Sequence, residues 1–174
     1  MSSAELEDLQ KGVWTAYGRA AYEAQCFEVQ VASLILISHI ASNPLVGSAE
    51  LSAIHVGLSR RNLGNLLQHL GSRVTLPVGL HDRLSGWREQ RNYLMHRFFF
   101  ENANALLSPS GCERMTIELV GIERALAEAD AIVTTLTEAL MDALDNAVGF
   151  PKARIDREIR AAVIAALAKD DDAS

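Results

Sequence analysis

Apolar residues recur at helical spacing along almost the whole chain. The first such pattern starts at Ser2 and Glu5, which stand at capping-box spacing, and ends near Pro44. Its apolar stripe keeps a three-four rhythm through Trp14, Tyr17, Ala21, Ala24, Glu28, Val31 and Ile35. The pattern predicts one long amphipathic helix, and Glu28 is a charge inside its apolar stripe.

Three more helical segments follow, and then a short fifth helix. The second segment covers residues 48–71, with a break near Gly57 and Ser59, and the third covers residues 80–105. The fourth covers residues 113–148, and the fifth, residues 152–168, precedes an acidic tail at 169–174. We therefore expect an all-α fold, an antiparallel four-helix bundle with a short fifth C-terminal helix. It would form a single helical domain over residues 1–174 with a core at about 3–148.

The composition agrees with helices that pack through aliphatic side chains. Of the 174 residues, 49% are hydrophobic but only 6% are aromatic, and there are 4 prolines. A β-sandwich or barrel would need more β-branched and aromatic residues and more turns. The composition therefore argues against an all-β fold.

Several features bear on the location of the protein. The two cysteines, Cys26 and Cys112, lack the spacing of a metal site and indicate reduced thiols of an intracellular protein. The acidic first residues lack the apolar segment of a secretory signal. The most apolar run, residues 29–41, is shorter than the ~20 residues of a membrane span. We therefore expect a cytoplasmic protein with no membrane partner.

Charge is distributed unevenly along the chain. The formal net charge of −6 argues against a nucleic-acid partner. Residues 59–97, however, hold seven arginines against Asp82 and Glu89, a net charge of +5 that leaves −11 for the rest. Arginine suits bidentate phosphate contacts, so this stretch favours RNA or a nucleotide as partner. The alternative is that the arginines lie on solvated helix faces and pair with the acidic remainder.

A charge also lies on the apolar face of the third predicted helix. Arg91 falls in the middle of a stripe formed by Leu80, Leu84, Trp87, Leu94 and Phe98. Buried charges are costly unless they are paired, so Arg91 and Glu28, two opposite charges on two apolar faces, are expected to meet. The alternative is that each long side chain reaches the edge of the bundle.

The same helix carries candidate catalytic groups on another face. Asn92 and His96 stand one turn apart, and Glu89 precedes Asn92 by nearly one turn. An imidazole, an orienting amide, a nearby carboxylate and the Arg91 cation suit metal-free RNA cleavage. The alternative is a surface histidine beside a core arginine. There is no glycine-rich phosphate loop and no histidine spacing typical of a metal site, so neither a cofactor nor a metal is expected.

The segment Arg91-Asn92-x-x-x-His96 matches an R-x4–6-H motif and resembles the motif-bearing helix of the HEPN superfamily. The helix order over residues 6–148 looks similar as well. The resemblance implies that His96 is the acid/base, Arg91 the phosphate-binding cation and Asn92 a supporting polar group. Beside them, Arg88 and Arg97 are candidate substrate-binding cations, and Glu28 and Glu89 are candidate supporting residues.

The resemblance also implies a homodimer in which two copies line one cleft. Active members cut RNA without metal and often act as toxins or in defence, so the resemblance also implies an antitoxin or another protein as a candidate partner. Because relatives with the fold have lost catalysis, the alternative is a non-catalytic helical module that binds a nucleotide, RNA or a protein. On an ideal helix Arg91 and His96 point about 140° apart. They can converge through the long arginine, a helix distortion or a two-protomer cleft.

Overall fold

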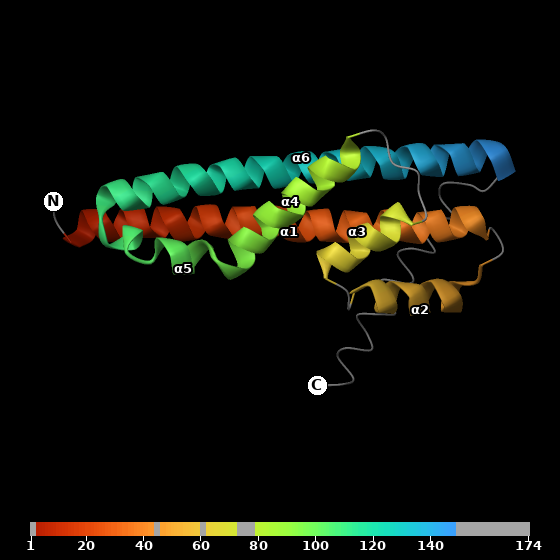
Figure 1. Ribbon diagram of the computed structural model, residues 1–174, viewed down its shortest axis with the longest axis horizontal. Helices are drawn as coiled ribbons and strands as arrows, with labels where there is room; N and C mark the ends of the chain where they lie inside the picture. The colour runs from red at the N-terminus through yellow and green to blue at the C-terminus, as the bar shows by residue number, and fades with distance from the viewer. Residues whose placement is uncertain (1–2, 44–45, 60–61, 73–78, 149–174) are drawn as a thin grey trace. The chain divides into compact units, whose positions relative to one another are not determined.

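The described part of the chain is entirely helical. A computed structural model describes residues 3–43, 46–59, 62–72 and 79–148 (Figure 1). Its elements are α1 (Ser3–Ser42), α2 (Ser48–Ser59), α3 (Leu63–Gly71), α4 (Leu80–His96), α5 (Phe98–Asn102), the 3-10 helix η1 (Ala105–Leu107) and α6 (Pro109–Val148). These ranges contain no strand, which confirms the all-α fold class. The predicted fifth helix at 152–168 and the acidic tail lie outside the described residues.

The described residues fall into two compact units. The first unit takes α1 up to Phe27, all of α4, α5 and η1, and α6 up to Ala131. The second takes the rest of α1, from Glu28, together with α2, α3 and the part of α6 from Ile132. Both long helices therefore contribute to both units. The single domain over 1–174 stays a prediction.

Within the first unit, α4 runs antiparallel to α6. Arg83, near the start of α4, forms an ion pair with Glu128 of α6. Tyr93, near the end of α4, bonds to Glu118, which comes earlier in α6. As α4 advances, its partners on α6 therefore move back along the chain.

The parts of α1 and α6 in this unit run in the same direction (Figure 1). Gln10 of α1 donates a hydrogen bond to the carbonyl of Leu106, just before α6, and Arg19 pairs with Glu123 at 3.2 Å. The predicted antiparallel order therefore holds for α4 but not for α1 against α6. The chain reverses its direction between α4 and α6, through α5 and η1. Between α1 and α4 it passes through two helices, α2 and α3, and α4 then runs opposite to α6 and so opposite to α1.

The buried stripe of α1 lies beside the predicted one. In the first unit it consists of Val13, Ala16, Ala20, Ala24 and Phe27. Trp14, which was expected in the stripe, is 53% exposed, because its ring stacks on Phe99 at 4.4 Å at the edge of the core. Glu28, which was expected inside the stripe, is half-buried, and its Oε1 is buried.

The second unit buries α1 on nearly every side. Its buried residues on this helix are Val31, Leu34, Ile35, Leu36, Ile37, Ser38 and Ile40. The predicted interruption of the second segment is confirmed, since α2 ends at Ser59 and α3 begins at Leu63. Asn62 caps α3, because its side-chain oxygen accepts a hydrogen bond from the Asn65 N–H at 3.0 Å.

The helix α1 is also long and apolar enough, by length and composition, to cross a membrane. The shortness of the run at residues 29–41 therefore does not by itself exclude a membrane span. Half of its most apolar window is buried inside the structure, and a buried core helix or a signal sequence near the N-terminus passes the same test of length and composition. The cytoplasmic location stays a prediction.

The third predicted helix is broken. Instead of running from 80 to 105, α4 ends at His96, and Arg97, with φ −127° and ψ −25°, separates it from α5. Three phenylalanines, Phe98, Phe99 and Phe100, follow the break directly. Phe98 is fully buried between Tyr17 and Tyr93.

The start of α6 lies four residues before the predicted start at Glu113. Ser108 is extended, and its hydroxyl accepts a hydrogen bond from the Gly111 N–H at 3.2 Å, as at a helix N-cap. Pro109 follows at the first helical position, where a missing N–H has no cost. Residues 109–112, which lay between two predicted helices, are therefore the capped first turn of α6.

Asp130 of α6 provides a test of the packing. Its Oδ1 is buried and has no hydrogen-bond partner among the described residues, and burial raises the pKa of this carboxyl. When a carboxyl has a higher pKa in the folded state than in the unfolded state, its protonated form favours folding. This contribution to the free energy of unfolding is lost as pH rises through the folded-state pKa. Asp130→Asn should therefore raise Tm in neutral buffer, with little effect in buffer below the ordinary carboxyl pKa.

Thermal unfolding followed by circular dichroism at both pH values tests this expectation. Glu138→Gln, which removes an exposed carboxylate from the same helix, is the matched control and should change Tm little. A lower Tm for Asp130→Asn in neutral buffer would show that the Asp130 carboxylate is stabilising.

Candidate functional site

The predicted site residues lie in the C-terminal half of α4 and at its break. The helix is continuous from Leu80 to His96, so a break between Arg91 and His96 does not bring these two side chains together. The buried stripe of Leu80, Leu84, Trp87, Leu94 and Phe98 is confirmed. Arg91, in register with it, is half-buried.

Arg91 and Asn92 are in direct contact. The Nη1 of Arg91 donates a hydrogen bond to the Oδ1 of Asn92 at 3.2 Å. Asn92 and His96 are both exposed and stand one turn apart on the same helix. No hydrogen bond or ion pair within the described ranges occupies the His96 imidazole. The His96 imidazole and the Asn92 amide are thus both exposed to solvent, and the Arg91 guanidinium donates a hydrogen bond to that amide.

The other predicted residues have partners of their own. Glu89 lies 3.9 Å from Arg88, and Arg97 lies 3.7 Å from Glu101. Glu89 is therefore engaged by its neighbour in the chain. Glu28 belongs to the second unit and Arg91 to the first, so their pairing stays a prediction.

Several of the described arginines in the basic stretch, residues 59–97, lie close to acidic side chains. Arg83 pairs with Glu128 and lies 4.9 Å from the centre of the Trp87 ring. Arg88 and Arg97 also each have a carboxylate within 4 Å. These contacts match the alternative in which the arginines offset the acidic remainder. Arg60, Arg61 and Arg73 lie outside the described residues.

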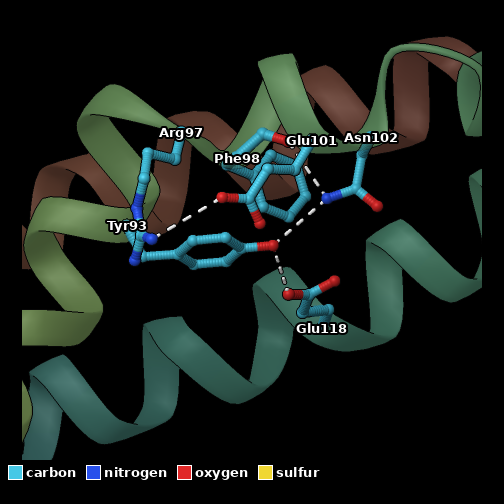
Figure 2. Close-up of polar contacts among 6 residues, drawn as sticks. All are labelled: Tyr93, Arg97, Phe98, Glu101, Asn102 and Glu118. Carbon is cyan, nitrogen blue, oxygen red and sulfur yellow. Dashed lines mark hydrogen bonds and ion pairs between the residues drawn. The ribbon is translucent and has the colours of Figure 1, made fainter.

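A polar cluster that the sequence did not indicate holds the break in place (Figure 2). The Tyr93 hydroxyl donates to Oε1 of Glu118 at 2.8 Å and accepts a hydrogen bond from Nδ2 of Asn102 at 3.2 Å. The same Asn102 amide also donates to the Phe98 carbonyl at 3.0 Å. This cluster therefore joins α4, α5 and α6.

The pKa of Tyr93 suits its role as a hydrogen-bond donor in this cluster. Burial, followed by the hydrogen bond to Glu118, raises the pKa of Tyr93. The phenol therefore keeps its proton and remains a donor to the Glu118 carboxylate. The guanidinium of Arg97 lies 5.4 Å from the centre of the Tyr93 ring, within the range of a cation–π contact. Tyr93 thus fixes the segment in which His96 and Arg97 end α4.

Metal-ligating side chains and thiols are the other groups of the chain that could carry chemistry. In the part of the chain that the structure describes, no group of three or more His, Cys, Asp or Glu residues could hold a metal ion. Cys112 is fully buried and Cys26 is half-buried, and both are free thiols. The groups that face solvent together at the end of α4 are therefore acid–base and cationic groups.

Comparisons of the chain with known protein families, with curated proteins and with solved structures found no match.

Proposed function

We propose that this protein is a metal-independent endoribonuclease of HEPN type. The observation that supports the proposal is the exposed His96 at the end of α4, one turn from an Asn92 amide that Arg91 contacts at 3.2 Å. These are the groups that cleavage at a ribose 2′-hydroxyl needs: a base, an orienting amide and a cation.

In the proposed reaction His96 takes the proton of the 2′-hydroxyl. The 2′-oxygen then forms a bond to phosphorus, and the bond from phosphorus to the 5′-oxygen breaks. The leaving oxygen takes a proton from an acid, for which the same histidine of a second copy is suited. Arg91 stabilises the charge on the phosphorane, and the products are a cyclic phosphate end and a 5′-hydroxyl end.

The proposal requires a second copy of the chain. Because α4 is continuous through Arg91 and His96, these side chains diverge within one copy, and two copies related by a two-fold axis can place one of each in a shared cleft. Light scattering at micromolar concentration should give about twice the 19.0 kDa of the chain. A monomer mass would count heavily against the proposed cleft.

A second candidate is a non-catalytic helical module that binds a nucleotide, RNA or a protein partner. It is favoured by the carboxylates beside Arg88 and Arg97, which reduce the positive charge available to a scissile phosphate. A role as a toxin or defence component, with an antitoxin as partner, belongs to the nuclease proposal. The module would retain RNA without cutting it, and salt would weaken the binding.

Incubation of the purified protein with total RNA, with and without EDTA, separates the two candidates. The nuclease should produce fragments with cyclic phosphate ends in both conditions, because the proposed reaction uses only side-chain groups. RNA that is bound but remains intact would favour the module.

A further inference from the structure

The i to i+4 register of α4 continues into α5 across the break. The Arg97 N–H donates to the Tyr93 carbonyl at 2.9 Å, and the Glu101 N–H donates to the Arg97 carbonyl at 2.9 Å. The side chains show the same alignment, since Arg97 lies over the Tyr93 ring and pairs with Glu101 at 3.7 Å (Figure 2). Tyr93, Arg97 and Glu101 therefore form one row of side chains.

The residues one position earlier form a parallel row: Asn92, His96 and Phe100. All three are exposed. Phe100 is 88% exposed, the largest value among the exposed large hydrophobic side chains of the described residues. Phe100 follows His96 by four residues, as Glu101 follows Arg97, and the side chains of that neighbouring pair are 3.7 Å apart.

Phe100 is carried by a firmly held helix. Its neighbour Phe98 is fully buried, and Phe99 stacks on Trp14 at 4.4 Å and contacts Tyr17 at 4.8 Å. Because two aromatic side chains anchor α5, the Phe100 ring is presented to solvent and is not free to turn into the core. An exposed aromatic ring held in this way offers a face on which a base can stack.

We propose that Phe100 stacks on an unpaired base of single-stranded RNA, next to the phosphate at His96. This inference rests on the proposed function and names its substrate class. Stacking on an aromatic ring needs a base free of its own duplex, whereas the bases of an RNA helix are already stacked and paired. Arg91, on one side of the row, supplies a cation for a flanking phosphate, which favours RNA over an apolar protein surface.

The test uses the full chain carrying His96→Ala, so that bound RNA is not cut. Fluorescence anisotropy measures the affinity for a short labelled single-stranded RNA and for the same RNA as a duplex. Adding Phe100→Ala should weaken single-strand binding about tenfold or more and leave duplex binding nearly unchanged. Phe100→Trp should keep the affinity, and Phe100→Leu, which is apolar but cannot stack in this way, should behave like alanine.

Ile117→Ala is the matched control, because Ile117 of α6 is 73% exposed in the same unit and lies outside the row. It should leave RNA binding unchanged. Equal single-strand affinity with Phe100→Ala, or wild-type affinity with Phe100→Leu, would overturn the inference. A loss of the dimer mass in Phe100→Ala would also overturn it, by placing Phe100 in an interface between copies.

Failure of this inference differs from failure of the proposed function. Cleavage that needs His96 but is indifferent to Phe100→Ala would leave the nuclease and remove the stacking residue. A wild-type protein that never cuts RNA, but binds single strands through Phe100, would remove the nuclease and keep the inference. Absence of any RNA binding would overturn both.

Discussion

A His96→Ala variant is expected to lose about 10²–10⁴-fold in RNA cleavage, the usual worth of general acid–base catalysis. The imidazole is the group that the proposed reaction uses to move protons, and a methyl group cannot replace it. Folding should be nearly unchanged, because His96 is exposed at the end of α4 and makes no hydrogen bond or ion pair with the other described residues. Circular dichroism and Tm measured on the same preparation check this point.

His81→Ala provides the matched control for this loss. His81 is exposed, lies on the same helix and stands at its other end, where its ring is 3.7 Å from Asp82. It should leave the cleavage rate unchanged, and EDTA should have no effect on either protein. Cleavage that persisted in a clean preparation of His96→Ala would mean that the active site lies elsewhere.

Gly111→Ala is expected to destabilise the fold by about 3 kcal/mol, the upper end of the usual cost of overpacking. Gly111 is buried in the first turn of α6, and a Cβ added there would overlap the backbone of Ala105, its carbonyl oxygen first. A clashing side chain could change rotamer, but this carbonyl is fixed by the hydrogen bond it accepts from the Ser108 N–H. The turn from η1 into α6 would therefore have to move.

Urea unfolding measures the effect, and Gly121→Ala is its control. Gly121 lies on the exposed side of the same helix, and a Cβ there would meet no atom within 4 Å. Its replacement should stabilise the protein by up to ~1 kcal/mol, since alanine is the better helix former. Equal behaviour of the two variants would show that the approach of Gly111 to Ala105 is not tight in solution.

The helices that the sequence predicted well are those whose signals are local. The limits of α1 followed from a capping pair and a proline, and the stripe of α4 followed from leucines at helical spacing. The start of α6 also had a local signal, Ser108 before Pro109, but the predicted helix began only at Glu113. That error was one of interpretation, because the capping information was present.

The break at Arg97 had no comparable local signal. The residues that follow it, Phe98 and Phe99, pack against Trp14 and Tyr17, which lie more than eighty positions earlier in the chain. The same holds for the candidate site. Spacing alone placed Asn92 and His96 on one face of α4, but Glu118, which holds Tyr93, comes from another helix and could not be found by spacing.

The division of α1 and α6 between the two units has a consequence for the integrity of the chain. Residues 28–78 separate the two segments of the first unit, and residues 79–131 separate those of the second. No single cut therefore releases either unit as one continuous fragment. The segment that interrupts each unit belongs to the other unit. When one unit folds, it holds the two ends of that interrupting segment in place, which lowers the entropy cost of closing the loop. The two units are thus coupled through the connectivity of the chain, and a truncation that removes part of α1 or α6 weakens both.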